Sequence, residues 1–162
     1  MIELSELLTP GRIGCQRDIR SKKRALQTLA ELLAPSVSAG EEDDELSEMD
    51  IFDALITRER LGSTALGHGV ALPHSRLADL DEPIAAMITL SDGVDYEASD
   101  NQPVDLLVGL LVPEKCNDEH LKILAELAKR FSSDYFRDEV RAFGVDEPEA
   151  LYAFLQQPAS EA

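Results

Sequence analysis

The chain has 162 residues, a length that suits one domain, and 44% of them are hydrophobic, which is enough for a core. Its formal net charge of −17 comes from 32 acidic and 15 basic side chains. A surface of this sign repels nucleic acid and anionic membranes, so we expect neither as a partner. It favours basic proteins as partners instead.

The sequence favours a cytoplasmic location. Its two cysteines, Cys15 and Cys116, make no disulfide framework and suit a reducing compartment. The N-terminus lacks the basic start and apolar centre of a signal peptide. The most apolar run, residues 104–112, is shorter than the roughly 20 residues of a membrane-spanning helix. We therefore expect no membrane-inserted segment.

One helix and one loop are predicted near the start of the chain. The first twenty residues contain several chain breakers and predict an irregular beginning. Apolar residues at helical spacing then predict a helix that begins after Ser21, its N-cap, and stops at Pro35. The polar and acidic stretch that follows, residues 36–46, predicts an exposed loop.

A second helix is predicted to end near Glu59. Ser47 and Asp50 have the spacing of a capping box, and Leu46 and Ile51 have that of a hydrophobic staple. The expected apolar face consists of Ile51, Phe52, Leu55 and Ile56.

Short strands are predicted next. Residues 64–66 and 70–72 suit two strands joined by a turn at residues 67–69, and Pro73 ends the second. A longer strand is predicted over residues 84–90.

The last third combines a buried strand with helices. Residues 104–112 form a nearly continuous apolar run, which predicts a strand buried on both faces. Three helices should follow, with Asn117 and Ser133 as N-caps of the first two and Asp146 near the start of the third. The first of them is expected to turn Leu121, Leu124, Leu127, Ala128 and Phe131 inward. This order indicates one mixed sheet with helices packed on it.

Histidine can be neutral and nucleophilic near pH 7, and the chain has three. His74 follows Pro73 at the end of a short apolar strand, where its ring should emerge at a sheet edge. His120 falls in the first turn of a predicted helix, where the dipole favours a neutral ring and a nearby phosphate. His68 lies between two glycines and could shape a pocket. The residues alone leave each open as an incidental surface histidine.

Other residues near these histidines could hold a phosphate. The guanidinium groups of Arg58, Arg60 and Arg76 could each brace one with two parallel hydrogen bonds. Gly69 permits close backbone approach. Hydroxyl donors are available from Ser63, Thr64 and Ser75. Spacing alone leaves all of them open as ordinary surface residues.

Familiar cofactor motifs are missing from the sequence. It has no GxxxxGK[ST] loop, no dinucleotide fingerprint, no CxxC pair and no HExxH. Three histidines with carboxylates leave a metal site open. Metal ligation would, however, block the nitrogen that a phosphoryl carrier needs.

Two segments resemble one known family. The stretch TRERLGSTALGHGVALPHSR, residues 57–76, resembles the signature of the fructose/mannitol-type IIA domains of the bacterial phosphotransferase system. NQPVDLLVGLLVPEKCNDEHLKILAELAKRF, residues 101–131, resembles the same family, and the similarity is greatest to its nitrogen-branch regulatory members. The resemblance implies one domain over residues 1–156 and a frayed tail over 157–162. It also implies an α/β three-layer sandwich, with a mixed β-sheet flanked by helices on both faces.

The resemblance implies a phosphotransferase component without a cofactor. His74 matches the phosphorylated histidine, His120 the second active-site histidine and Arg58 an arginine that helps to hold the phosphate. The donor would be a histidine phosphocarrier protein, with phosphoenolpyruvate as the ultimate source. The phosphate environment would draw on His68, Gly69, Ser63, Thr64, Ser75 and Arg76.

Three functions remain open at this point. The chain could be a regulatory phosphoprotein that acts on a target such as a transporter or a sensor kinase. It could instead pass phosphate to a IIB sugar permease component. The third alternative is a metal- or anion-binding module without transfer chemistry. The acidic run, residues 41–45, is longer and more charged than the family leads us to expect.

Overall fold

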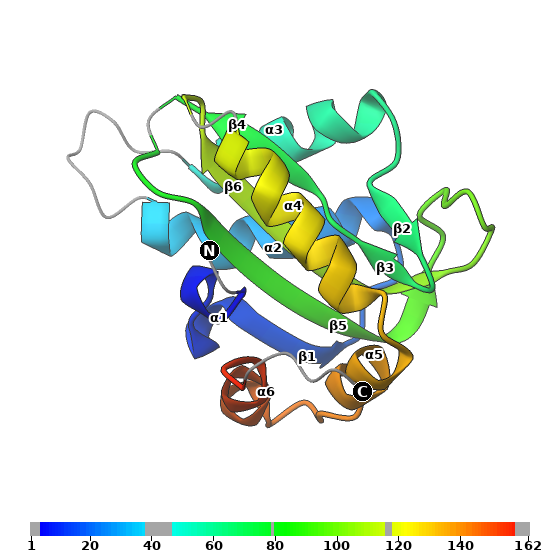
Figure 1. Ribbon diagram of the computed structural model, residues 1–162. Coiled ribbons are helices and arrows are strands. Elements are labelled where there is room, and N and C mark those ends of the chain that lie inside the picture. Colours follow the sequence, from blue (N-terminus) through cyan, green and yellow to red (C-terminus); the bar gives the residue numbers. More distant parts are fainter. Residues whose placement is uncertain (1–3, 38–46, 79, 116–117, 158–162) are drawn as a thin grey trace.

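A mixed β-sheet forms the centre of the protein in a computed structural model that describes residues 4–37, 47–78, 80–115 and 118–157 (Figure 1). The strand order is β1-β5-β6-β3-β2, and β4 also pairs with β6. The strands are β1 (Ile13–Arg17), β2 (Ala65–Gly67), β3 (Val70–Ala71), β4 (His74–Leu77), β5 (Ile84–Val94) and β6 (Val104–Pro113). The helices are α1 (Leu4–Leu7), the 3-10 turn η1 (Pro10–Arg12), α2 (Lys22–Val37), α3 (Glu48–Arg60), α4 (Asp118–Phe131), α5 (Asp134–Arg141) and α6 (Pro148–Leu155).

Strand β6 lies inside the sheet and pairs with three other strands. β5 runs antiparallel to it, whereas β3 and β4 run parallel to it, one after the other. Val70 pairs with Leu106, and His74 pairs with Leu110 further along the same strand. The break at Pro73 therefore carries His74 to one end of the sheet.

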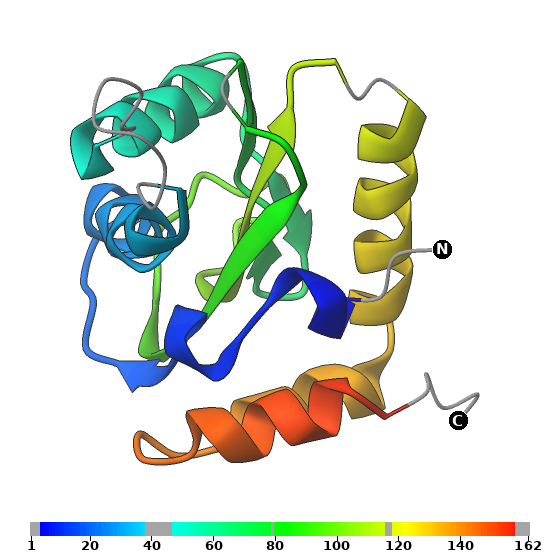
Figure 2. The same cartoon turned by 90° about the vertical axis from the view of Figure 1, so that its left-hand side faces the viewer.

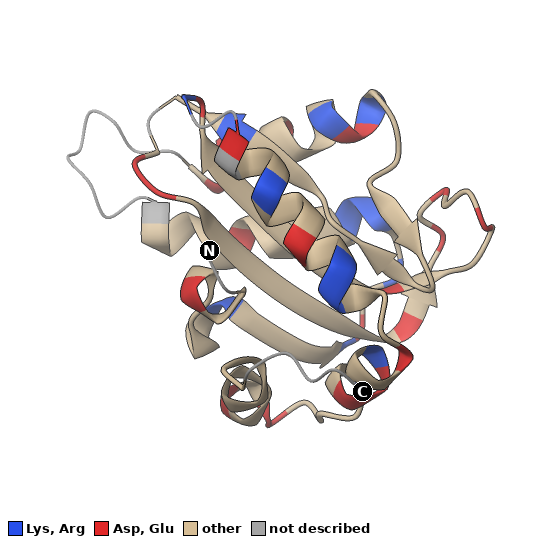
Figure 3. Ribbon diagram, in the orientation of Figure 1, with Lys and Arg blue, Asp and Glu red and all other residues tan. Residues whose placement is uncertain are grey.

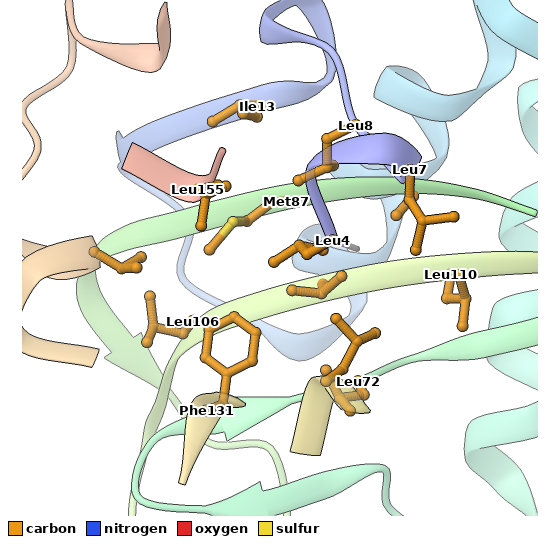
Figure 4. Packing of buried hydrophobic residues seen from close by; sticks show 14 of the residues in the cluster. Leu4, Leu7, Leu8, Ile13, Leu72, Met87, Leu106, Leu110, Phe131 and Leu155 are labelled. Carbon is orange, nitrogen blue, oxygen red and sulfur yellow. The ribbon is translucent and has the colours of Figure 1, made fainter. Parts of the chain in front are cut away.

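Helices cover both faces of the sheet and give three layers (Figure 2). Helices α2 and α3 pack on one face, where Leu29 and Leu55 are buried. Helices α4, α5 and α6 pack on the other, where Phe131 and Leu155 meet residues of β5 and β6 such as Met87 (Figure 4). The predicted α/β three-layer sandwich is confirmed.

The apolar run of β6 supplies both halves of the core. Successive strand residues point to opposite faces. Leu106 and Leu110 accordingly join the cluster under α4, while Leu107 and Leu111 join the cluster under α2. The prediction of a strand buried on both faces is confirmed.

Local capping chemistry is as predicted where the structure describes it. The side chain of Ser47 accepts the N–H of Asp50, and the Asp50 carboxylate accepts the N–H of Ser47. Ser133 caps α5 by accepting the N–H of Phe136, and Ser21 accepts the N–H of Arg24 at the start of α2. Leu46 and Asn117, the predicted staple and cap residues, lie outside the described residues.

Two sheet elements differ from the sequence-based expectation. The first twenty residues were expected to be irregular, and this is wrong, because they form α1, η1 and β1. Strand β1 contains Gly14 and is held by parallel pairing with β5, a long-range interaction that local breakers do not reveal. The separate strand β4, which starts at His74, was not predicted either.

Helix α2 and the acidic segment also differ from expectation. The predicted stop at Pro35 is wrong, because α2 continues to Val37 with Pro35 inside it. A proline in the last turn removes a single backbone donor, and the chain can complete that turn without it. Ser36 and Val37 are therefore helical rather than part of a loop. The rest of the predicted acidic loop, residues 38–46, lies outside the described residues.

The inward face of α4 was predicted with one error. Leu121 is 64% exposed, whereas Ile123 and Leu127 are buried against the sheet. The helix is rotated so that His120 rather than Leu121 lies against the sheet in its first turn. Among the described helices, none is long and apolar enough to cross a membrane.

Candidate functional site

His74 is the first residue of β4, and a single hydrogen bond fixes its ring. Its Nδ1 lies 2.7 Å from the carbonyl oxygen of Leu72. A carbonyl oxygen only accepts, so Nδ1 of the neutral ring carries the proton and Nε2 carries the free lone pair. The ring is half-buried. The local chain Leu72-Pro73-His74 thus selects the tautomer in which Nε2 is the nucleophilic nitrogen.

His120 approaches His74 from α4. Its ring centroid lies 5.2 Å from that of His74, with the ring planes at 60°. Its side chain is buried, and its Nδ1 has no hydrogen-bond partner in the part of the chain that the structure describes. Buried polar atoms are nearly always paired. The His120 ring therefore lies beside His74 with one buried nitrogen that is unpaired among the described residues.

Both histidine rings are biased toward the neutral form. Burial lowers the pKa of His74, and Arg58 and Arg76 lower it further, although the bond to Leu72 and the charge of Glu59 oppose this. Burial also lowers the pKa of His120, with additional contributions from His74, Arg76 and Arg58. A neutral ring at pH 7 is the form that can act as a nucleophile.

Helix α3 brings Arg58 to the same place. Its Nη1 donates a hydrogen bond of 2.9 Å to the carbonyl of Gly62, directly after the helix. Basic residues are visible at the end of α3 and in β4 (Figure 3). The side chains of these elements surround a hollow of about 550 Å³, which we call the histidine hollow. It is lined by Asp53, Ala54, Thr57, Arg58, Leu61, His74, Ser75, Arg76 and His120.

The histidine hollow unites five of the candidates found in the sequence: His74, His120, Arg58, Ser75 and Arg76. Two guanidinium groups beside two neutral rings suit an anion, because arginine pairs well with phosphate oxygens.

The other candidates lie elsewhere. His68 and Gly69 line a separate hollow of about 380 Å³, together with Asp105 and Arg141. Their neighbourhood is a structural network, since Arg141 pairs with Asp105 and donates to the carbonyl of His68. Ser63 donates to the carbonyl oxygen of Tyr96, away from the histidine hollow.

Thr64 is buried rather than exposed to the histidine hollow. Its hydroxyl and backbone N–H both bond the carboxylate of Glu59. It therefore joins α3 to the start of β2 and does not line the histidine hollow.

From the sequence we did not identify the residues of α3, and of the turn after it, that line one side of the histidine hollow. Asp53, Thr57 and Leu61 line the histidine hollow together with Arg58. These positions recur three to four residues apart, so they share one helical face. That spacing was available in the sequence, but only the position of Arg58 over β4 shows which face matters.

The described residues contain no cluster of side chains that could bind a metal ion. No group of three His, Cys, Asp or Glu side chains lies close enough there to hold an ion.

Comparison with known proteins identifies the family of the chain. The family described as "Phosphoenolpyruvate-dependent sugar phosphotransferase system, EIIA 2" matches residues 6–157, and the chain belongs to it.

Individual relatives are more specific. The chain is 42% identical over 155 residues to a nitrogen regulatory protein of Pseudomonas aeruginosa, covering 96% of both chains. The crystal structure of nitrogen regulatory protein IIA-Ntr from Neisseria meningitidis matches with a TM-score of 0.84 and 36% identity, over 94% of this chain and 99% of that one. A fructose-specific EIIA component of Haloferax volcanii is 31% identical over 128 residues, 79% of each chain.

Proposed function

We propose that the chain accepts a phosphoryl group on Nε2 of His74 from a histidine phosphocarrier protein and acts mainly as a regulatory phosphoprotein of the nitrogen branch. The observation that carries the proposal is the bond from Nδ1 of His74 to the Leu72 carbonyl, beside Arg58 and His120. Similarity to nitrogen regulatory proteins over nearly the whole chain supports the regulatory role.

The proposed step is a direct displacement at phosphorus. Nε2 of His74 attacks, and a new Nε2–P bond forms as the N–P bond of the donor phosphohistidine breaks. The electron pair of the broken bond stays on the donor nitrogen. The Nδ1 proton of His74 stays in place, and its bond to Leu72 strengthens as the ring gains positive charge.

The surrounding residues lower the barrier by positioning and by electrostatics. Arg58 and Arg76 offer guanidinium donors to the oxygens of the transferring group. A neutral His120 ring carries one N–H, which can donate to the same oxygens. No metal ion or organic cofactor takes part in the proposed step.

The modification would act as a signal through charge. A phosphoryl group adds negative charge and strong acceptors at one face of the molecule, which changes the partners that can dock there. The target would be a protein such as a transporter or a sensor kinase. The donor and its phosphoenolpyruvate source would act in the cytoplasm, so we propose that location for this cycle.

A second role has one specific observation in its favour. The relative from Haloferax volcanii is a fructose-specific EIIA component. The same site would then pass the phosphoryl group to a IIB permease component. Restored sugar uptake in a strain without its own fructose or mannitol IIA would support this role, and failure to restore uptake would leave the regulatory one.

Intact-mass measurement tests the phosphoryl step. The chain is incubated with phosphoenolpyruvate, the first-stage kinase and a histidine phosphocarrier. We expect one acid-labile phosphoryl group on the wild type and on His68→Ala, whose histidine lies in the other hollow. We expect none on His74→Ala. No gain by the wild type, or an equal gain by His74→Ala, would contradict the proposal.

A further inference from the structure

Glu59 is a buried carboxylate that the proposed phosphoryl step does not use. It follows Arg58 in the last turn of α3 and is only 7% exposed. Successive helix residues point about 100° apart, so the turn that directs Arg58 to the histidine hollow directs Glu59 into the protein. Burying a carboxylate costs free energy unless it is fully paired, so its partners are informative.

The carboxylate of Glu59 receives donors from three other segments. The backbone N–H of Thr64 lies 3.2 Å from both oxygens, and the Thr64 hydroxyl bonds Oε1. The Tyr96 hydroxyl donates over 2.7 Å, and Nζ of Lys22 lies 3.3 Å from Oε2. All four partners are donors, which suits the ionised, acceptor-only carboxylate. One side chain thus joins the end of α3 to the residue before β2, to α2 and to the connection between β5 and β6.

Residues 61–63, the segment that orients Arg58, are held at both ends by hydrogen bonds to Glu59. The Glu59 carbonyl accepts the N–H of Gly62, and its carboxylate accepts the N–H of Thr64. Between these anchors, Leu61 is 82% exposed and no atom lies within 4 Å of a Cβ built on Gly62. The segment therefore has little packing of its own. Yet the carbonyl of Gly62 is the acceptor that holds the Arg58 guanidinium.

A second path leads from Glu59 to His74. The carbonyl of Thr64 accepts the N–H of Leu72 over 3.1 Å. The carbonyl of Leu72 in turn fixes Nδ1 of His74. Thr64, whose N–H and hydroxyl both donate to Glu59, is therefore shared by the path to the arginine and the path to the histidine.

We propose that Glu59 is a positioning residue for the phosphoryl transfer: its buried carboxylate holds Arg58 and His74 so that both face the histidine hollow. It touches neither the phosphoryl group nor the reacting nitrogen, and it acts through Thr64 and Gly62. This inference rests on the proposed function, because the step that it serves is the transfer to His74.

The kinetic test compares Glu59→Gln with Glu48→Gln. The control removes the same charge from the exposed first turn of the same helix. We expect Glu59→Gln to lower kcat for transfer from the phosphorylated carrier about tenfold, with KM within about twofold, because small displacements of positioned groups reduce rate strongly. Glu48→Gln should match the wild type.

A double-mutant cycle separates positioning from general loss of structure. In an Arg58→Ala background, Glu59→Gln should lower kcat clearly less than the roughly tenfold expected in the wild type, because one of the two groups that it positions is gone. An equal loss of kcat with and without Arg58, or no loss in either, would overturn the proposal. If Glu59→Gln fails to fold, Tyr96→Phe removes one donor at nearly constant volume. It should lower kcat about threefold with the same dependence on Arg58.

An NMR measurement separates this inference from the proposed function. In Glu59→Gln we expect shifted signals for the Arg58 Nε–H and the Gly62 amide, whether or not the protein is phosphorylated. Wild-type signals for both groups would overturn the positioning role. If the wild type accepts no phosphoryl group but these signals shift, the proposed function fails while the link from Glu59 to Arg58 stands.

Discussion

The rings of His74 and His120 meet edge to face, with their centroids 5.2 Å apart. One ring comes from β4 and the other from the first turn of α4, beside which β4 lies (Figure 1). The two rings differ in the hydrogen bonding of their Nδ1 atoms. His74 has its Nδ1 fixed by Leu72, whereas the Nδ1 of His120 has no partner among the described residues. The pair therefore consists of one ring whose orientation is fixed by a hydrogen bond and one ring whose Nδ1 has no such bond among the described residues.

This asymmetry predicts different losses for the two histidines. His120→Ala should still accept a phosphoryl group, but about 100-fold more slowly, as for the loss of one preorganised donor. His74→Ala should accept none. Rapid-quench measurement of the phosphorylated fraction against time checks both variants. Equal loss in the two variants would contradict this division of roles.

Arg58 should contribute through charge and geometry together. Arg58→Ala should slow transfer about 100-fold, and Arg58→Lys should recover only part of the loss, because an ammonium lacks the planar fork of a guanidinium. Arg60→Ala is the matched control, since Arg60 is exposed on the same turn and does not line the histidine hollow. Similar rates for Arg58→Ala and Arg60→Ala would remove the proposed role of Arg58.

The two histidines should make the fold less stable in mild acid. Their pKa values in the folded chain lie below the ordinary value of 6.5. Below pH 6.5 the unfolded chain therefore binds protons that the folded chain does not bind, and stability falls as the pH drops from about 6.5 toward the lowered values. Urea midpoints at several pH values check this. The fall should be smaller in the His74→Gln/His120→Gln double variant, and an equal fall would contradict the prediction.

Gly69 should matter for stability rather than for phosphoryl transfer. Its φ is +82°, and an added Cβ would lie 2.6 Å from Nη2 of Arg141 and 2.8 Å from Oδ1 of Asp105. Gly69→Ala should therefore destabilise the fold by about 1–3 kcal/mol. Gly11→Ala, where the nearest atom is 3.8 Å away, should change stability by less than about 0.5 kcal/mol. Urea denaturation checks both, and equal midpoints would refute the strain at Gly69.

Features that depend on neighbours in sequence were predicted well. The capping box of Ser47 and Asp50 and the cap at Ser133 involve residues three apart, so the sequence specifies both partners. The strand over residues 104–112 follows from its unbroken apolar run. Strand β1 was missed, because its pairing with β5 is long-range and its own residues include Gly14.

The candidate site shows the same division. His74, His120 and Arg58 were found from their residue types and from the resemblance of their surroundings to one family. The sequence could not show that His68, near His74 along the chain, belongs to a different hollow. Two residues separate β3 from β4, and β4 pairs with a later part of β6 than β3 does. This pairing moves His74 away from His68, and only the tertiary structure shows it.

The sequence by itself determined the caps, the buried strand, the family and the residue types available for chemistry, because these depend on local spacing and composition. Tertiary structure alone decided which side chains meet. Packing of α3 and α4 on opposite faces of one sheet brings Arg58, His74 and His120 to a single hollow. It also buries Glu59 under donors from α2, from the residue before β2 and from the β5–β6 connection, since a carboxylate can leave water only where the fold supplies its partners.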